Sequence, residues 1–480
     1  MTHVHLIGIG GTGLSAIARV LLERGYEVSG SDRVLSPQAG ELAALGARVL
    51  VGHQAGHVRG ADLVVRSSAV PDDNPEVQAA LAAGVPVLKR AQFLGELMRD
   101  QQVIAVAGTH GKTTTTAMIA WVLTSLGLDP SYIVGSTVKN LNQNAHAGQG
   151  SAFVIEADEY DRMFLGLNPN VAVVTYLEHD HPDCYPTMES YRAAFAEFIQ
   201  RIKPGGLLLT CQDTAKTRRL TQAVPAGARA CTYGLSAGAE YVAEDAHPNA
   251  HGGYDYQAVW QPAGSPRVSL GSVQLQAPGM HNLRNSLAAL AAVHSVLPAG
   301  SRHQHMPAAA QALGSFTGTG RRFDLQGEPG GIAIIDDYAH HPTEIQATLA
   351  AARARYPQRR IWAVWQPHTY SRTSALLPAF AGSFGDADRV LVTEVYPSRE
   401  QAKDFNNFSA AQVVANMQHP GAQFSPTLDE TVQNLLQQLV SGDVLLVLSA
   451  GDADQVSARL LAALQAAESP VQARKENGNG

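Results

Sequence analysis

Three observations predict an α/β protein made of three consecutive domains. The chain has 480 residues, more than one ordinary hydrophobic core accommodates. Short apolar runs alternate with stretches of helical periodicity along most of its length, a pattern typical of parallel sheets covered by helices. Glycine-rich loops directly follow two of these apolar runs, at points where a strand would turn into a helix. We therefore expect ligand sites at the carboxyl ends of the strands.

The composition is that of a globular protein, with 45% hydrophobic and 16% charged residues. A formal net charge of −7 gives no support to a nucleic-acid or anionic-membrane partner. No apolar run approaches the roughly 18 residues of a membrane-spanning helix. The start "MTHVHLIGIGG" lacks the pattern of a signal peptide. Three cysteines without paired spacing argue against a disulfide framework or a zinc site, and together these features predict a cytoplasmic protein.

The first predicted domain covers residues 1–100. Its strands are the runs "HVHLI", "YEVSGSD", "ADLVVRSSAV" and "VPVLK", and "LSAIARVLLERG" has helical periodicity. The first turn contains Gly8, Gly10 and Gly13 in a G-x-G-x-x-G pattern, and Asp32 ends the second strand. This arrangement is typical of a dinucleotide or nucleotide-sugar site, with backbone amides at the pyrophosphate and the acid at a ribose hydroxyl. A tight turn without a ligand is the alternative.

The second predicted domain, residues 101–315, opens with a phosphate loop. The run "AVAGTHGKTTTTAM" lies between the apolar strand "QVIAVAG" and a helical run. Val106 replaces the first glycine of the G-x-x-x-x-G-K-[ST] pattern, which predicts a tighter loop. We expect Lys112 to reach the terminal phosphates of ATP and the Thr113 hydroxyl to bind Mg²⁺. A helix start capped by threonine is the alternative. The expected ATP contacts of the loop are Gly108, Thr109, His110, Gly111, Lys112, Thr113 and Thr114.

Acidic and histidine side chains follow the next two strands of this domain. They are Glu156, Asp158, Glu159 and Asp161 in "VIEADEYD", and Glu178, His179, Asp180, His181 and Asp183 in "LEHDHPD". Because ligands of open α/β sheets bind at the carboxyl ends of strands, we expect these groups beside the phosphate loop. Their oxygen atoms suit one or two Mg²⁺ ions. For each acid alone, a helix cap or a solvated loop is the alternative.

The rest of the second domain contains a strand and a long helix. The strand is "GGLLLT", the Gly-, Ala- and Pro-rich residues 234–280 predict a small antiparallel sheet, and "HNLRNSLAALAAVHSV" predicts the helix. Asn282 and Asn285 lie three apart on one face of the start of this helix. Taken alone, a helix cap and a turn explain them.

The third predicted domain covers residues 316–465, with strands in "GIAIIDDYAHHP", "IWAVWQPH", "DRVLVTEVYP" and "DVLLVLSAGD". Its arginine, histidine and aspartate residues suit the recognition of phosphate and carboxylate groups, and they are Arg321, Arg322, Asp336, Asp337, His340, His341, His368 and Arg372. The adjacent His340 and His341 do not readily face one metal ion, so we favour ligand contacts. The polar tail, residues 466–480, is expected to be disordered.

The motifs occur in the order "IGIGGTGLS", "GTHGKTTTT", "EADEYD", "EHDHPDCY", "GMHNLRN", "GRRF", "DDYAHHPTE" and "QPHTYSRT". In this order the sequence resembles the Mur ligases over essentially its whole length, and the first motif and the last two are the most specific. The resemblance implies the three-domain Mur ligase architecture. A Rossmann-like N-terminal domain would bind a UDP-sugar, a central P-loop domain would bind ATP, and a Rossmann-like C-terminal domain would bring in the amino acid.

The resemblance also implies an activity in peptidoglycan precursor synthesis that depends on ATP and Mg²⁺. Within the family, the motifs are most similar to the branch that joins L-alanine to UDP-N-acetylmuramate. In that reaction the lactyl carboxylate attacks the γ-phosphate of ATP, and the alanine amine then attacks the acyl phosphate. The expected partners are these small molecules, without nucleic acid or membrane, and the chain is expected to be a monomer or a homodimer.

Individual roles follow from the motifs by the same resemblance. Lys112 is expected at the β- and γ-phosphates, and Thr113, Glu156 and His181 at the metal. Asn282, Asn285, Arg322 and Asp337 are expected to contact ATP, and His368 and Arg372 the acyl phosphate or the amino acid. The remaining substrate contacts are expected from Gly8, Gly10, Gly11, Gly13, Asp32, Ser67, His340 and Arg372.

Two positions depart from the family pattern. Tyr176 stands where members usually have Asn at the end of a strand, and Thr369 stands where many have Arg directly after "QPH". The second change leaves one fewer cation for the alanine carboxylate, so Arg372 is expected to carry more of that role.

Other functions fit parts of the sequence. A ligase for recycled murein tripeptide shares "GTHGKTTT" and "EADEYD" but lacks a segment like "QPHTYSRT". An NAD-dependent oxidoreductase would use the first glycine loop and leave the second unexplained. A nucleotide switch would use the second loop without ligase chemistry. L-alanine, glycine and L-serine differ by one small group, and the sequence does not distinguish them.

Overall fold

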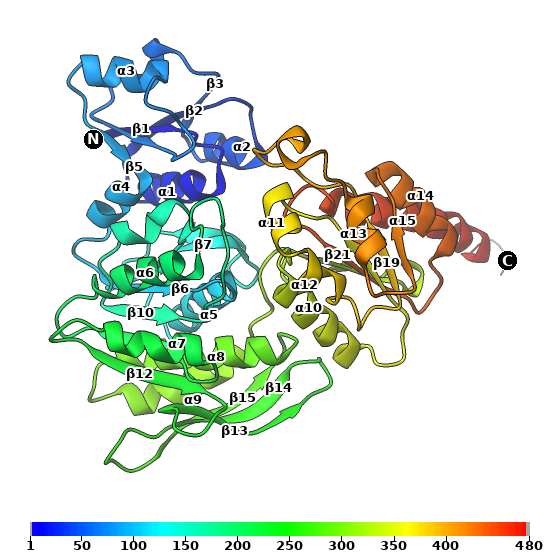
Figure 1. Ribbon diagram of the computed structural model, residues 1–480. Helices are drawn as coiled ribbons and strands as arrows, with labels where there is room; N and C mark the ends of the chain where they lie inside the picture. The colour runs from blue at the N-terminus through cyan, green and yellow to red at the C-terminus, as the bar shows by residue number, and fades with distance from the viewer. Residues whose placement is uncertain (1, 477–480) are drawn as a thin grey trace.

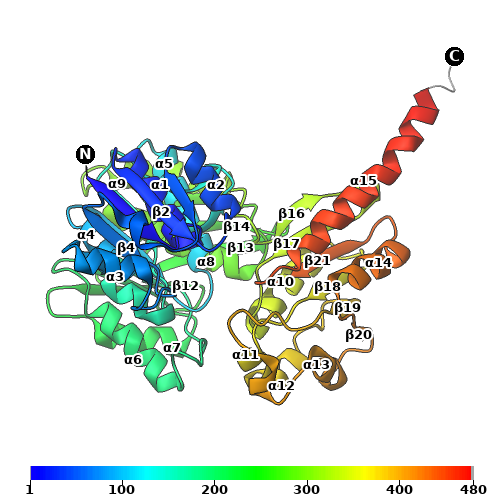
Figure 2. The same cartoon turned by 90° about the horizontal axis from the view of Figure 1, so that it is seen from above.

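The computed structural model describes residues 2–476, which form three sheets (Figures 1 and 2). Each sheet is built from one continuous stretch of the chain, in the order that the alternating strand and helix patterns predict. In Figure 1 the N-terminal part lies above the central part, and the C-terminal part lies to its right. Over the described residues, no helix combines the length and the apolar character that crossing a membrane requires.

The N-terminal sheet is parallel throughout, with the strand order β3-β2-β1-β4-β5. The order reverses at β1, which places the loop after β1 at the topological switch point where nucleotides bind. The elements are β1 (His3–Ile7), α1 (Thr12–Glu23), β2 (Glu27–Asp32), α2 (Pro37–Ala44), β3 (Arg48–Val51), η1 (Ala55–Val58), β4 (Leu63–Arg66), α3 (Pro75–Ala82), β5 (Val87–Lys89) and α4 (Arg90–Leu97).

The central sheet has ten strands in the order β15-β14-β13-β12-β11-β10-β6-β9-β7-β8. Its strands are β6 (Gln102–Ala107), β7 (Ser131–Val138), β8 (Gln143–His146), β9 (Ala152–Glu156), β10 (Val171–Val174), β11 (Leu207–Cys211), β12 (Arg229–Gly234), β13 (Tyr241–Pro248), β14 (Tyr254–Trp260) and β15 (Val268–Leu275). Its helices are α5 (Lys112–Ser125), η2 (Tyr160–Gly166), α6 (Met188–Ile199), α7 (Ala215–Arg218), η3 (Arg219–Ala223), α8 (Met280–Val296) and α9 (Arg302–Gly314). The antiparallel pairs β13–β14 and β14–β15 confirm the small antiparallel piece expected over residues 234–280, which forms one edge of this ten-stranded sheet.

The C-terminal sheet has the order β16-β17-β21-β18-β19-β20, and only β16 runs antiparallel to its neighbour. Its strands are β16 (Asp324–Gly327), β17 (Ala333–Asp337), β18 (Ile361–Trp365), β19 (Arg389–Val392), β20 (Ala422–Phe424) and β21 (Val444–Leu448). Its helices are η4 (Pro329–Gly331), α10 (Pro342–Arg355), α11 (Tyr370–Ala375), α12 (Leu377–Ala381), η5 (Ala402–Phe405), α13 (Ala410–Asn416), α14 (Leu428–Gln438) and α15 (Asp454–Glu476).

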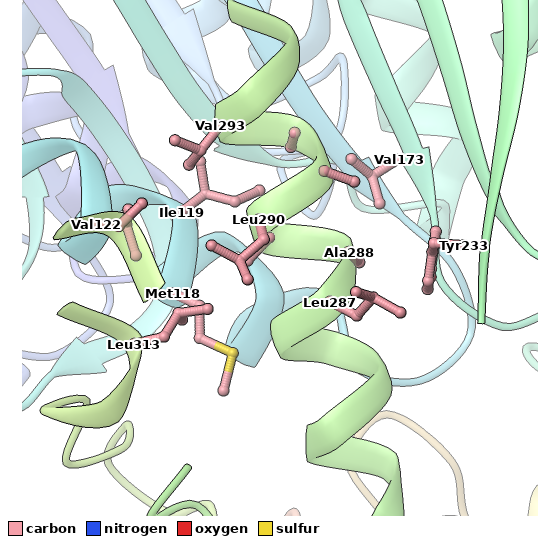
Figure 3. Packing of buried hydrophobic residues seen from close by; sticks show 14 of the residues in the cluster. Met118, Ile119, Val122, Val173, Tyr233, Leu287, Ala288, Leu290, Val293 and Leu313 are labelled. Carbon is pink, nitrogen blue, oxygen red and sulfur yellow. The ribbon is translucent and has the colours of Figure 1, made fainter. Parts of the chain in front are cut away.

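The largest core lies between the central sheet and the helices α5, α8 and α9 (Figure 3). Leu287 and Leu290 of α8 and Ile119 of α5 are buried completely, and Figure 3 shows them between the sheet and α9. Because α5 begins at the phosphate loop and α8 begins beside it, this packing fixes both helix starts relative to each other. The same apolar contacts that stabilise the domain therefore position the loop.

The helix α15 differs from the sequence prediction at its C-terminal end. Figure 2 shows it extending away from the C-terminal sheet, and its backbone is helical to Glu476. Residues 466–476 were expected in a disordered tail, and the structure corrects this expectation. Propensity does not account for this, since Pro470 lies inside the helical stretch. Residues 477–480 lie outside the described residues, and the domain boundaries near residues 101 and 316 stay predictions.

A buried histidine makes the stability of the central domain depend on pH. Burial lowers the pKa of His294 to about 3, while its Nδ1 lies 3.0 Å from the Tyr241 hydroxyl. An unfolded chain takes up this proton near pH 6.5, so the unfolded state binds more protons between about pH 6.5 and pH 3. Stability contributed by neutral His294 is therefore complete above about pH 6.5 and falls as the pH drops toward 3.

We expect His294→Gln to reduce this acid sensitivity, because glutamine does not titrate and can still bond to Tyr241. Urea unfolding at pH 7 and pH 4.5 measures the effect. It can be followed by the fluorescence of Trp260, whose ring lies 4.8 Å from that of His294. The wild-type free energy of unfolding should fall more between the two pH values than that of the variant. An equal fall in both proteins would contradict the assignment.

Candidate active site

The phosphate loop joins β6 to α5 and depends on glycine at two positions. Gly108 and Gly111 have φ angles of +132° and +82°, which side chains disfavour. A Cβ at Gly111 would lie 2.5 Å from Oδ1 of Asn285, and one at Gly108 would lie 2.2 Å from Oγ1 of Thr175. Thr109 fixes the loop to the next strand end, because its amide donates to the carbonyl of Tyr176 at 2.8 Å. The glycines are thus required by space as well as by conformation.

A cavity of about 580 Å³ opens in front of this loop, between the central and C-terminal sheets. Most of the residues predicted to contact ATP line it, namely His110, Gly111, Thr113, Thr114, Asn282, Asn285, Arg322 and Asp337. They come from the phosphate loop, α5, α8 and the C-terminal domain, so the structure brings together residues that lie more than two hundred positions apart. Tyr176, one of the two departures from the family pattern, also lines the cavity, and its ring stacks on His110 at 5.7 Å.

Lys112 is held by the buried Glu159, which lies farther from the His181 ring, at 3.9 Å. Its Nζ donates to Oε1 of Glu159 at 3.0 Å and to the carbonyl of Gly108 at 2.6 Å. Glu159 is 0% exposed and also accepts from the Tyr191 hydroxyl at 3.1 Å. Burial alone would lower the pKa of Lys112, but the charges of Glu159 and Glu156 raise it. The ammonium is therefore a fixed positive charge beside the loop.

Thr113 and Glu156 form the pair that the sequence predicts for a metal. The Thr113 hydroxyl lies 3.1 Å from Oε1 of Glu156, and the other oxygen of Glu156 accepts from the amide of Gly135 at 2.8 Å. Two oxygen ligands at right angles around Mg²⁺, each about 2.1 Å away, are about 3.0 Å apart. The spacing and the donor atoms of this pair therefore fit Mg²⁺.

His181, the third predicted metal residue, faces a different acid. Its Nε2 lies 3.6 Å from Oδ2 of Asp180 and 3.9 Å from Oε1 of Glu159. The backbone of His181 has a φ angle of +54°, which turns the chain sharply at this position. Glu159 therefore lies between the His181 ring and Lys112, and its Oε1 is near both. His181 thus reaches the phosphate loop through Glu159 and not through Glu156.

A ring of charged groups joins the phosphate loop to the C-terminal domain. Nδ1 of His110 lies 3.0 Å from Oε1 of Glu344, and its Nε2 lies 3.2 Å from Oε2 of Glu178. Burial alone would lower the pKa of His110, but Glu344 and Glu178 raise it to about 9. Thr343 donates its hydroxyl to Oε2 of Glu178 at 2.7 Å, across the same boundary.

Arg372 makes a second connection across this boundary. Its Nε and Nη2 donate to Oδ1 of Asp180 at 3.0 and 2.8 Å, and both residues are buried. Burial alone would raise the pKa of Asp180, but the Arg372 guanidinium holds it well below its usual range. Burial also lowers the pKa of His340 to about 3 and that of His368 to about 4, so both rings are neutral at pH 7. His368 lies beside the guanidinium, with Nδ1 3.2 Å from Nη1.

The surroundings of Thr369 show what replaces the arginine of the family pattern. Its hydroxyl donates to Oε1 of Glu400 at 3.0 Å, and the amide of Ser371 donates to Oε2 of Glu400 at 3.0 Å. Where many family members have an arginine, Thr369 and Ser371 thus hold the carboxylate of Glu400.

Asp337 lies at the end of β17 and is held by the backbone. Its two oxygens accept from the amides of Phe323 and Ala339 at 2.7 and 2.8 Å. Burial raises the pKa of Asp337 to about 6 even though Arg322 and these amides oppose the shift. Arg322 stacks over Tyr338 at 5.0 Å, and its Nη1 lies 3.9 Å from Oε1 of Glu344.

The first glycine loop lies near the carboxyl edge of the N-terminal sheet. Gly8 has a φ angle of +92°, and Gly11 precedes α1 as its cap. The amide of Gly10 donates to Oδ2 of Asp32 at 2.9 Å, so this carboxylate, predicted to hold a ribose, also holds the loop. A Cβ at Gly8 would lie 3.1 Å from Cβ of Ser67, which places Ser67 against the loop.

A second, smaller cavity of about 150 Å³ runs from this loop to the central domain. Gly13 and Arg90 line it on the N-terminal side, and Glu156 and Asp158 line it on the central side. Arg90 lies 3.3 Å from Oδ2 of Asp158, which joins the two domains. Glu156 is therefore adjacent both to the phosphate loop, through Thr113, and to the space that leads to the first glycine loop.

Four acids that hold this site together received no individual role from the sequence. They are Glu159, Glu178, Asp180 and Glu344. The first three belong to the acidic runs expected at the strand ends, but their partners are remote in sequence. Glu344 has a local signal, since "HHPTE" places proline at the first and glutamate at the third position of a helix, as in a capping box.

Comparison with known proteins agrees with this architecture. Residues 3–102, 106–293 and 321–451 match the family models described as the Mur ligase family catalytic domain, the Mur ligase middle domain and the Mur ligase glutamate ligase domain. The UDP-N-acetylmuramate–L-alanine ligase of Laribacter hongkongensis is 44% identical over 476 residues, which cover 97% of this chain and 99% of that protein. The enzyme of the same name from Acidithiobacillus ferrooxidans is 42% identical over 458 residues, covering 95% and 96%.

Solved structures give the same result. The UDP-N-acetylmuramate–alanine ligase of Thermotoga maritima superposes with a TM-score of 0.77 at 29% identity, over 97% of this chain and 100% of that one. A murein peptide ligase of Psychrobacter arcticus superposes with a TM-score of 0.72 at 26% identity, over 97% and 99%. With the three matched domains and the full-length relatives, this chain belongs to the Mur ligase family.

Proposed function

We propose that this protein ligates L-alanine to the lactyl carboxylate of UDP-N-acetylmuramate, with the cleavage of ATP to ADP and phosphate. The observation that carries the proposal is the position of Glu156. It contacts Thr113 of the phosphate loop and lines the cavity that leads to the first glycine loop. A carboxylate substrate anchored by its UDP group at Gly8–Gly13 would thus meet the terminal phosphate of ATP where the two spaces converge.

The charges of the site suit the first chemical step. A carboxylate and a triphosphate repel each other, so the attack on the γ-phosphate needs positive charge at the reacting atoms. Lys112 supplies a buried ammonium there. Mg²⁺, held by Thr113 and Glu156, would neutralise charge on the phosphate oxygens. We also assign His181 to this metal region, where it would approach through Glu159.

The second step requires a free amine and the exclusion of water, because water would hydrolyse an acyl phosphate. Alanine would enter from the C-terminal domain, near His340, His368 and Arg372. The two imidazoles are neutral at pH 7 and can accept hydrogen bonds from the amine without repelling it. The amine attacks the acyl carbon, the amide bond forms, and phosphate leaves. The Arg372–Asp180 contact keeps the two domains together during this step.

The adenine and ribose of ATP would occupy the larger cavity, with Asn282 and Asn285 on one wall and Arg322 and Asp337 on the other. The NAD-dependent oxidoreductase interpretation gives this cavity and the second loop no role. Because its substrates are nucleotides of the cell interior, we place the reaction in the cytoplasm. Whether the chain acts as a monomer or a homodimer stays a prediction.

The test is phosphate release from ATP by the full-length protein with Mg²⁺ and UDP-N-acetylmuramate, screened against the twenty amino acids and the murein tripeptide. We expect release to require both the UDP-sugar and L-alanine, with glycine and L-serine weaker. Preference for the tripeptide would instead assign the recycling activity that the Psychrobacter arcticus protein is named for. Phosphate release without either substrate would contradict ligation altogether.

A further inference from the structure

A group of two histidines and a glutamate lies at the boundary between the central and C-terminal domains, beside the metal pair Thr113–Glu156 but separate from it. It consists of His110, Glu178 and His341, and one ligand atom of each residue lies within 4.8 Å of the others. His110 and Glu178 belong to the central domain, and His341 caps α10 of the C-terminal domain. We call this group the boundary triad, and we propose that it binds a divalent transition-metal ion such as Zn²⁺.

The distances within the boundary triad suit a tetrahedral site. Nε2 of His110 lies 3.2 Å from Oε2 of Glu178, and Nδ1 of His341 lies 3.7 Å from the same oxygen. Ligands about 2.0–2.1 Å from a tetrahedral zinc ion are about 3.3 Å apart, a value between these two distances. The ligand atoms of the third pair, His110 and His341, lie within 4.8 Å of each other. Nδ1 of His341 also accepts from the Thr343 amide at 3.4 Å, a contact that an ion would replace. The Thr343 hydroxyl, 2.7 Å from Oε2 of Glu178, or a water supplies the fourth position.

The contacts behind the boundary triad orient its ligands. Nδ1 of His110 is bonded to Oε1 of Glu344 at 3.0 Å, which leaves Nε2 facing Glu178. Histidines that bind metals almost always donate their other ring nitrogen to a carboxylate or a carbonyl in this way. Glu344 itself is fixed as the third residue of α10, where it accepts from the amide of His340 at 3.1 Å. The Glu344–His110 contact therefore matches the carboxylate–histidine pair found behind metal ions.

The electrostatic surroundings also favour a cation here. Oε1 of Glu344 and Oε2 of Glu178 lie 3.0 and 3.2 Å from the ring nitrogens of His110, so carboxylates from two domains flank this point. Arg322, whose Nη1 lies 3.9 Å from Oε1 of Glu344, is a cation that faces the group. A metal ion at Nε2 of His110 would face these carboxylates directly.

The donor atoms select the kind of metal. Two imidazole nitrogens and one carboxylate suit Zn²⁺ and its transition-metal neighbours, whereas Mg²⁺ prefers oxygen ligands in an octahedral shell. The boundary triad would thus bind its ion alongside Mg²⁺ at Thr113 and Glu156. The cysteine spacing gives no sign of this site because its ligands are histidine and glutamate. His341 would share the ion with His110, which is remote in sequence, and not with the adjacent His340. Since the ligands come from both domains, the ion would hold the C-terminal domain against the phosphate loop.

Equilibrium dialysis of chelator-treated full-length protein against Zn²⁺ in excess Mg²⁺ tests the proposal. We expect about one Zn²⁺ per wild-type chain. Glu178→Gln and His341→Asn should lose this stoichiometric binding, and asparagine keeps a hydrogen-bond acceptor at the start of α10. Glu344→Gln, which changes only the residue behind His110, should weaken binding by about 10–100-fold. The matched control is His247→Ala, which removes an exposed histidine of β13 and should bind as the wild type does.

A second measurement keeps the test decisive if a variant fails to fold. Zinc-edge X-ray absorption of the wild-type protein should show two nitrogen neighbours at about 2.0–2.1 Å. A shell of oxygens alone, wild-type binding of less than one ion, or unchanged binding in a folded His341→Asn would each overturn the proposal. None of these measurements uses ligase activity, so their failure leaves the proposed function untouched.

Discussion

Replacing Lys112 with methionine is expected to lower the rate of phosphate release by about 10²–10³-fold or more, because the buried ammonium is a principal source of positive charge at the phosphate loop. Methionine preserves most of the length and apolar volume of the lysine stem, so the loop keeps its packing. The measurement is kcat for phosphate release at saturating ATP, UDP-N-acetylmuramate and L-alanine.

The same substitution is expected to destabilise the protein, and a second change separates the two effects. Without the ammonium, Glu159 is left as a buried acid without its cation, at a cost of about 3–5 kcal/mol. In Lys112→Met combined with Glu159→Gln the uncompensated charge is absent, so the melting temperature should recover while kcat stays low. Recovery of kcat together with stability would show that Lys112 acts only as the partner of Glu159, which would contradict its assignment to the phosphates.

Replacing Asp180 with asparagine is expected to weaken the closed arrangement of the central and C-terminal domains. The change leaves the Arg372 guanidinium buried beside a neutral side chain, and breaking a buried pair costs about 3–5 kcal/mol. Because the pair joins two domains, we expect the substitution mainly to reduce the free energy of domain closure. The free energy of unfolding of either domain should change less. Small-angle X-ray scattering should show a larger radius of gyration, and kcat should fall with it.

The matched control for Asp180→Asn is Glu197→Gln. Glu197 also pairs with an arginine, Arg162, but both side chains are about half exposed and lie within the central domain. Exposed pairs contribute about 0–1 kcal/mol, so this variant should keep the wild-type radius of gyration and rate. If Asp180→Asn behaves like this control, the Arg372–Asp180 contact does not hold the domains together.

Much of the fold follows from local sequence patterns. The runs "VIAVA" and "AII" contain only alanine, valine and isoleucine, and they form most of the interior strands β6 and β17. Strands β7 and β12 were missed, since "SYIVGSTV" and "RACTYG" mix polar residues and glycine with apolar ones. Their extended conformation is stabilised by neighbouring strands, which a short sequence window does not reveal.

The sequence could predict contacts between site residues that directly follow neighbouring strands. Thr113 and Glu156 end up in contact because β6 and β9 are neighbours in a parallel sheet, and ligands gather at the carboxyl ends of such strands. The partner of Lys112 and the partners of Arg372 and His110 could not be predicted in this way. The Arg372–Asp180 and His110–Glu344 pairs depend on how one domain is placed against another, and the Lys112–Glu159 pair depends on how two loops of the central domain pack. No periodicity in the sequence records either placement.

The position of β6 inside its sheet anchors the start of the phosphate loop. β6 is hydrogen-bonded to β10 on one side and to β9 on the other. The helix that follows it, α5, packs against α8. Interior strands open only when the surrounding structure unfolds, whereas contacts between domains open at much lower cost. The strand that leads into the phosphate loop is therefore anchored in the core of the central domain, and it is expected to open only when that core unfolds.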